Sequence, residues 1–180
     1  FRSQYLTASA ALGFRDADEV GVNTYYSDGR NWYDTNDFYD SRLDKKLSSA
    51  SIYIRNQLGD GWSSTLRLGQ SQDETTDQAD FAPASRFETT QQQFVWQNDI
   101  RLGDGMLLAA YEYTREEVEG TADYDKDKRD VNAVLLGWSG RFGAHSLQLN
   151  ARHDDNSQFG DKTTGLVGYG YQLSPEWSVR

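Results

Sequence analysis

The chain alternates between two kinds of connection, and this alternation constrains its fold more than any single motif does. Amphipathic segments of strand length are joined in turn by a tight turn and by a long acidic connection. The tight turns lie at Arg15–Glu19, Gly59–Gly61, Gly103–Gly105, Gly143–His145 and Ser174–Glu176. The long connections are Asp28–Lys45, Asp73–Glu88, Glu116–Asp130 and Asp154–Lys162. Antiparallel strands with short turns at one end and long loops at the other are typical of a bacterial outer-membrane β-barrel.

Within the expected strands, apolar and polar side chains alternate with a period of two, which indicates a sheet with two different faces. The clearest example sets Phe94 and Trp96 against Gln93 and Gln97, whereas Val131–Arg141 is apolar at both sets of positions. Amide and charged side chains would be costly in a dry core and cost little beside water or a polar filling. We therefore predict an all-β fold, an antiparallel up-and-down transmembrane β-barrel with about nine or ten strands over residues 1–180.

Composition supports this interpretation and excludes others. Only 37% of the residues are apolar and 13% are aromatic, and the mean hydropathy is −0.80. The most apolar segment, Met106–Tyr111, is far shorter than a membrane helix, and there is no cysteine for a disulfide framework. The net charge is −10, and 20 of the 28 acidic residues lie in the long connections. This charge argues against nucleic acid and favours a divalent cation, a cationic ligand or solvation.

The chain starts within one expected strand and stops at Arg180 as another begins. An open barrel edge in lipid leaves backbone groups without hydrogen-bond partners. We therefore expect residues 1–180 to be a contiguous segment of a larger barrel, without a plug domain. A complete ten-stranded barrel is the alternative.

Two acidic segments are candidate cation sites. Five aspartates lie between Ser27 and Asp44, and calcium binds six to eight such oxygens in flexible geometry. A solvated acidic loop is the alternative. Asp123–Asp127 imitates the start of an EF-hand, but Lys128 replaces the required glycine and Val134 stands at the twelfth position. A solvated loop is the better interpretation there.

Catalytic candidates are sparse. His153 and Asp155 could activate a water, as in an outer-membrane barrel hydrolase, but the second acidic pair that such an enzyme needs cannot be located. His145 lies at a tight turn and is expected to be structural, and Ser139 lacks the spacing of a nucleophile elbow. We predict that the protein is not an enzyme.

The segment Ala151-Arg152-His153-Asp154-Asp155-Asn156-Ser157-Gln158-Phe159-Gly160 resembles a segment of the TonB-dependent vitamin B12 (cobalamin) receptors of Gram-negative outer membranes. Trp96–Asp99, the turn before Met106 and Arg141–Gly143 are similar to the same region in register. The resemblance extends from Val20 to Trp177 without large gaps.

The resemblance implies a barrel of about 22 strands in the outer membrane, filled by an N-terminal plug. It also implies a receptor for TonB-dependent cobalamin uptake, with cobalamin as the transported ligand. Its partners would be outer-membrane lipid, cobalamin, and TonB, which acts through the TonB box and plug. We expect that plug to lie outside these residues.

In the family, calcium orders the outer loops and raises the affinity for cobalamin. By this resemblance, Tyr33, Asp34 and Asp44 fall on positions that serve the calcium site, and Tyr33 also falls where the family contacts cobalamin. The other calcium ligands would come from an aspartate-rich loop upstream of Phe1, so these residues alone make an incomplete site.

Three alternatives remain open at this point. The chain could belong to a TonB-dependent receptor for a siderophore, haem or a glycan, since the barrel physics would be the same. It could also be a small ten-stranded hydrolase that uses His153 and Asp155, or a passive porin.

Overall fold

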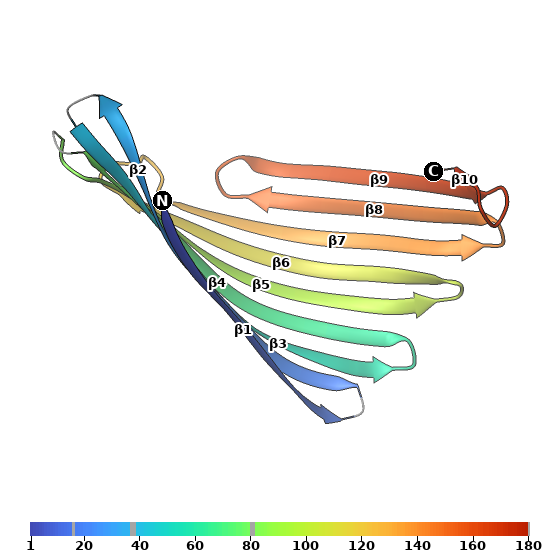
Figure 1. Cartoon of the computed structure of the whole chain (residues 1–180). Coiled ribbons are helices and arrows are strands. Elements are labelled where there is room, and N and C mark those ends of the chain that lie inside the picture. The colour runs from blue at the N-terminus through green and yellow to red at the C-terminus, as the bar shows by residue number, and fades with distance from the viewer. Residues whose placement is uncertain (16, 37–38, 80–81, 180) are drawn as a thin grey trace.

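The computed structural model is one antiparallel sheet of ten strands, each paired with the next along the chain (Figure 1). The structure describes residues 1–15, 17–36, 39–79 and 82–179, and within these it gives no side chains for residues 34–36 and 39–40. The strands are β1 (Arg2–Arg15), β2 (Asp18–Asn36), β3 (Tyr39–Gly59), β4 (Trp62–Ala79), β5 (Ser85–Leu102), β6 (Gly105–Gly120), β7 (Lys128–Phe142), β8 (His145–Asn156), β9 (Gly160–Gln172) and β10 (Ser178–Val179). The predicted all-β, up-and-down fold is confirmed.

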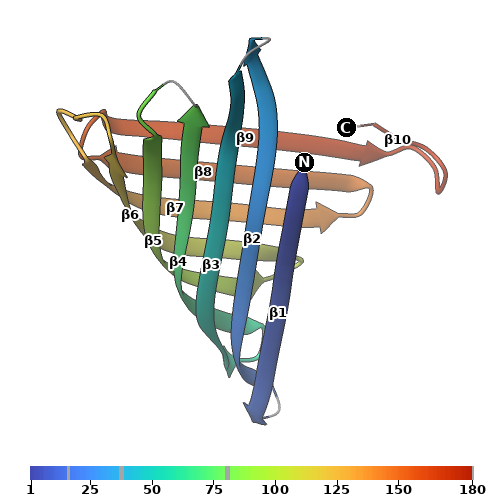
Figure 2. The same ribbon diagram turned by 60° about the vertical axis from the view of Figure 1, so that its left-hand side comes forward.

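The sheet is twisted and curved, so that β1 and β2 cross the direction of β8 and β9 steeply (Figure 2). It is not closed, because β1 and β10 lie at its two edges. The part of the chain that the structure describes contains no helix long and apolar enough to cross a membrane.

The strand register places the apolar side chains of successive strands in rows on one face. One such row runs through Ala10, Val22, Ile52, Leu68 and Phe94, each directly opposite the next. Most of these side chains are exposed, and the buried apolar side chains among the described residues are two alanines, Ala110 and Ala133. The sheet thus has an outward apolar band instead of a dry core, and we call this side the apolar face and the other the polar face.

The same register fixes the phase of β7, which alternation alone could not. Val134 pairs with Tyr111, and Leu136 and Trp138 follow it on the apolar face. Ala133 and Leu135 therefore lie on the polar face. Ala133 lies between Glu112 on β6 and Asp154 on β8, and its small side chain leaves room for longer polar side chains from these two strands.

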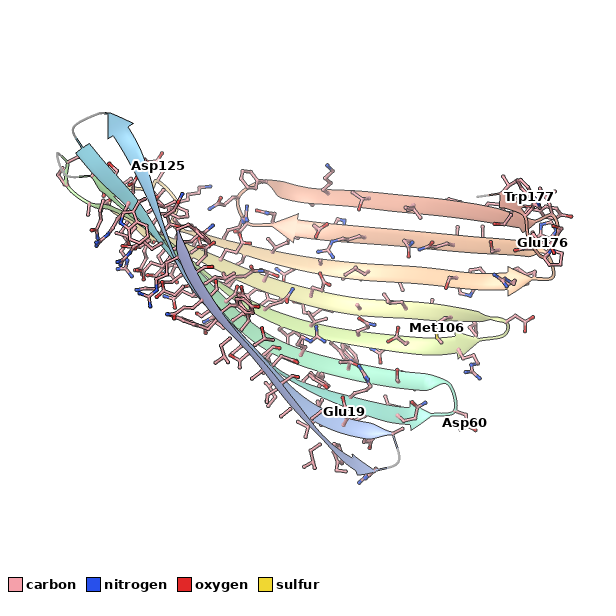
Figure 3. All side chains as sticks on the ribbon, in the orientation of Figure 1. Glu19, Asp60, Met106, Asp125, Glu176 and Trp177 are labelled. Atoms are coloured by element: carbon pink, nitrogen blue, oxygen red, sulfur yellow. The ribbon has the colours of Figure 1, made fainter. Side chains whose placement is uncertain are left out.

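Glycines in the left-handed region form the tight turns at one end of the sheet. Gly103 and Gly143 each have a φ of 59° at the first position of a two-residue turn, as a type II′ hairpin requires. At the other end the connections are shorter than the sequence indicated. Strands β4 and β5 extend to Ala79 and from Ser85, well into the segment expected to be a loop. Figure 3 shows Asp60 and Met106 at the tight-turn end and Asp125 at the opposite end.

We expect Gly103→Ala to lower the free energy of unfolding by about 1–2 kcal/mol, the cost of a left-handed conformation for a residue with a Cβ. The measurement is denaturant unfolding of the whole barrel in detergent. Gly59→Ala is the matched control, because a Cβ at either position has nothing within 4 Å and Gly59 does not have a positive φ. Equal losses at the two positions would contradict this explanation of the turn.

Candidate functional site: the long-connection end of the sheet

The strands extend past the apolar band toward the long connections, and there the same side of the sheet carries pairs of oppositely charged side chains. Asp44 on β3 lies opposite Arg30 on β2. Arg30 Nε donates to Asp44 Oδ1 at 2.5 Å, and Arg42 Nε donates to Asp44 Oδ2 at 3.1 Å. Both carboxylate oxygens of Asp44 are therefore engaged by guanidinium groups.

Similar pairs link the following strands. Glu74 on β4 lies 3.7 Å from Lys46 Nζ and 3.0 Å from Arg86 Nη2, and Arg86 also pairs with Glu88. Further along the sheet, Lys128 and Glu117 pair at 2.8 Å between β7 and β6. Opposite charges on neighbouring strands stabilise a sheet, which explains why the strands run past the apolar band into segments that are polar in sequence.

The hydrogen bond from Arg30 holds the pKa of Asp44 below its ordinary value, and the positive charges of Arg30 and Arg42 lower it further. Partial burial of the carboxylate acts in the opposite direction. Because the folded pKa is lowered, the bridge contributes stability at neutral pH and loses it as the pH falls through the pKa of the folded state. Arg30 and Arg42 would compete with any cation that bound the same carboxylate.

Tyr33 lies on the polar face, whereas Asp44 lies on the other side of the sheet. Its hydroxyl donates to Asp77 Oδ1 at 2.5 Å, which joins β2 to β4 across β3. Ser41, the residue of β3 opposite Tyr33 in register, is buried beneath this contact. The hydrogen bond to Asp77 raises the pKa of Tyr33, with smaller contributions from partial burial and from the charge of Asp77. The phenol is thus fixed in its neutral, donating form.

A hollow of about 300 Å³ lies near Tyr33 on the same face of β1–β4. Leu43 and Leu47 supply apolar lining, and Lys45, Asn31 and Asp73 supply polar groups. Asp73 Oδ2 is 4.0 Å from Lys45 Nζ, while the buried Oδ1 has no hydrogen-bond partner among the described residues. An amphipathic lining suits a ligand that carries both apolar surface and polar groups.

The structure places two of the three predicted calcium residues, Tyr33 and Asp44, on opposite faces of the sheet. Tyr33 and Asp44 point to opposite faces and are engaged by Asp77 and by two arginines, and the side chain of Asp34 lies outside the described residues. Among the described residues, no group of three or more His, Asp or Glu could hold a metal ion. Calcium binding at Tyr33, Asp34 and Asp44 stays a prediction.

The histidines are engaged in contacts on the apolar face. His153 Nδ1 lies 2.8 Å from Thr163 Oγ1, whereas neighbouring Asp154 accepts from Arg152 on the polar face. His145 Nδ1 lies 2.7 Å from the Tyr169 hydroxyl near the tight-turn end. Neither histidine has a hydrogen bond to a carboxylate in the described structure, so the arrangement lacks the oriented base that hydrolysis needs.

Sequence reasoning missed the partners of the predicted residues. Arg30 and Asp77 carry no local signal, because they meet Asp44 and Tyr33 only through the pairing of strands. A register inferred from the apolar alternation could have found Arg30, which lies directly opposite Asp44.

The fold, one antiparallel up-and-down sheet with an apolar and a polar face, is shared with the barrel walls of outer-membrane transporters of known structure. The FrpB iron transporter of Neisseria meningitidis superposes with a TM-score of 0.73 at 11% identity, over 98% of this chain and 34% of that one. The outer membrane transporter YddB of Escherichia coli gives 0.72 at 9% identity, over 95% and 29%. The ferric citrate transporter FecA gives 0.65 at 12%, over 98% and 34%. At these identities the likeness shows the fold alone.

The proteins similar in sequence share one name. The vitamin B12 transporter BtuB of Photobacterium profundum is 28% identical over 99% of this chain and 30% of its own length. The BtuB of Vibrio cholerae is 27% identical over 88% and 26%. The resemblance to vitamin B12 receptors is confirmed, and the chain spans about a third or less of the relatives it matches. No family model matches the chain.

Replacing Arg30 with Gln should raise the pKa of Asp44, because the strongest hydrogen bond to its charged form is removed. Carboxyl ¹³C chemical shifts followed by NMR across the acidic range would give this pKa in the folded barrel. Arg86→Gln, which removes a guanidinium from the separate Glu74 pair, should leave the pKa of Asp44 unchanged. An unshifted titration of Asp44 in Arg30→Gln would show that the bridge does not form in solution.

Proposed function

We propose that this chain is part of the barrel wall of an outer-membrane receptor for TonB-dependent uptake of cobalamin. The observation that carries the proposal is its similarity, over nearly all of its length, to proteins named vitamin B12 transporter. The apolar band on one face and the polar groups on the other support it physically, because a membrane barrel needs lipid on the outside and water or protein on the inside.

The barrel wall has no bond chemistry to perform in this role, and the relatives reported above are named transporters, which agrees with the expectation that the protein is not an enzyme. Its work is to bind the ligand selectively at the outer end and to hold the domain that closes the pore. Movement of the ligand would be driven through TonB, by a plug that contacts the polar face.

The ligand end would be the hollow beside Tyr33. Cobalamin is large and presents both apolar edges and amide groups, and the hollow could meet one edge of it through Leu43 and Leu47 together with the polar groups of Asn31 and Lys45. Tyr33 is held by Asp77 across β3 on the same face of the sheet. Calcium would bind at Asp34 at this end of the sheet.

A receptor for an iron chelate is the second candidate. It is favoured by the solved structures of the same fold, which include a ferric citrate transporter and a ferric preacinetobactin receptor. The wall described here would serve either ligand, so direct titration with cobalamin and with ferric chelates distinguishes the two.

Asp34→Ala in the full receptor should weaken calcium-dependent cobalamin binding, because one carboxylate ligand of the calcium ion is lost. Cobalamin is titrated in the presence of calcium and in the presence of a chelator. Asp125→Ala, which removes an exposed carboxylate from the β6–β7 connection, is the control. A wild-type receptor that ignores the chelator, or an Asp34→Ala variant with unchanged affinity, contradicts the calcium assignment. Absence of cobalamin binding under all conditions contradicts the proposed function itself.

A second experiment tests whether the apolar band of the sheet meets lipid. Ile52→Arg places a charge in the apolar band and should destabilise the folded receptor in lipid by about 2–4 kcal/mol, the cost of arginine at the middle of the bilayer. Ser51→Arg, one residue away on the polar face, should cost much less. Unfolding from lipid vesicles measures both, and equal losses would show that the apolar band does not meet lipid.

A further inference from the structure

A tyrosine lies flat against the polar face near the tight-turn end of the sheet. Tyr53 on β3 faces Gly21 on β2, and a Cβ at position 21 would stand 2.5 Å from its ring atoms. Its hydroxyl donates to Glu19 Oε1 at 2.5 Å. Glu19 is near the tight-turn end in Figure 3. The ring is therefore fixed in one position by a glycine beneath it and a carboxylate at its tip.

Two arginines flank this ring. The guanidinium carbons of Arg55 and Arg67 lie 6.0 and 5.9 Å from the ring centroid, a distance at which a cation is attracted to an aromatic face. Both residues are exposed. Tyr53 thus holds two positive charges close together at the surface of the polar face.

Neither guanidinium has an ion pair with a carboxylate in the part of the chain that the structure describes. Two other arginines of the polar face are paired with carboxylates, whereas Arg101 and Arg141 have no ion pair among the described residues. Arg152 pairs with Glu112 and Asp154, and Arg129 pairs with Glu116. Arg55 and Arg67 differ from the other arginines of this face because one aromatic ring holds their two guanidinium groups close together. The single carboxylate of Glu19, which accepts from Tyr53 and lies opposite Arg55 in register, has no ion pair with either.

A hollow of about 470 Å³ begins at Arg67 and extends over the polar face of β1–β5. Its lining includes Asn23, Ser51, Gln91 and Gln93. Amide and hydroxyl groups offer both donors and acceptors, which match the N–H and C=O groups of a polypeptide. A small free anion would satisfy the two arginines and leave this lining unused.

We propose that Arg55 and Arg67 bind an aspartate or glutamate carboxylate of a polypeptide segment that lies against the polar face and fills the pore. The inference rests on the proposed function, since a plugged receptor supplies such a segment. A guanidinium binds a carboxylate through two parallel hydrogen bonds, and covering two unpaired cations with protein is costly unless the cover brings negative charge. The acidic residue of the segment would thereby fix its position on the wall.

The test is a cross-link in the full receptor. Arg67→Lys introduces an amine at the site, and a carbodiimide joins an amine to a carboxylate in contact with it, with loss of water. Mass spectrometry should find the introduced amine joined to an Asp or Glu outside residues 1–180. Lys46 and Glu74, 3.7 Å apart on the other side of the sheet, provide the positive control within the same molecule.

Arg141→Lys, on the polar face of β7 and away from Tyr53, is the specificity control. The proposal is overturned if the control joins the same carboxylate, if the amine at position 67 joins only Glu19, or if it joins nothing while the Lys46–Glu74 link forms. The cross-link needs no cobalamin, so its failure is distinguishable from failure of the proposed function.

A second measurement does not depend on cross-linking. Arg55→Gln combined with Arg67→Gln should lower the urea concentration at which the receptor opens a conducting pore in a planar bilayer, because the segment has lost its anchor. Unboiled gel mobility confirms that the variant barrel is folded. If the double variant alters only the anion selectivity of the open pore, the arginines serve a permeating anion and the proposal is wrong.

Discussion

Strand register is the constraint on which the rest of this structure depends. Every strand is antiparallel to its neighbour in sequence, and a register shift of one residue would move its apolar side chains to the polar face. The pairings hold Val22, Ile52 and Leu68 in one row and place Tyr33 and Asp77 on the opposite side. Since the described chain buries almost no apolar side chain, the faces are defined by pairing and not by a core.

Arginine has three different roles on this sheet, and position decides which one. Beyond the apolar band, Arg30 pairs with Asp44 and lets the strands extend into polar sequence. On the polar face, Arg152 of β8 crosses β7 to reach Glu112 of β6, over the small side chain of Ala133. At the tight-turn end, Arg55 and Arg67 are held by an aromatic ring without a carboxylate. The first two roles stabilise the wall, and the third leaves charge available to a partner.

The sequence was most informative where a physical period repeats. Alternation predicted the faces of most strands correctly, and the glycines at positions 103 and 143 marked turns that need a positive φ. It failed for β7, because Leu135 and Leu136 are both apolar and only neighbouring strands decide which one faces outward. It also overestimated the loops, because acidic segments resemble loops until their cross-strand partners are known.

The candidate site was less accessible to sequence reasoning for the same reason. Tyr33 and Asp44 came from a family resemblance, which carries residue positions but not the partners they have here. The contacts of Tyr33 with Asp77 and of Tyr53 with Glu19 join residues 44 and 34 positions apart, and no local pattern encodes such pairs.

Pairing only between sequence neighbours has a consequence for how such walls change over time. Each hairpin contributes two strands, one tight turn and a part of each face, and it pairs with the rest of the sheet only through its two outer edges. A hairpin can therefore be duplicated or deleted without altering any other pairing, provided that the new edges keep the same alternation. The circumference of a barrel, and with it the size of the domain it can enclose, becomes a variable that selection can adjust in units of two strands.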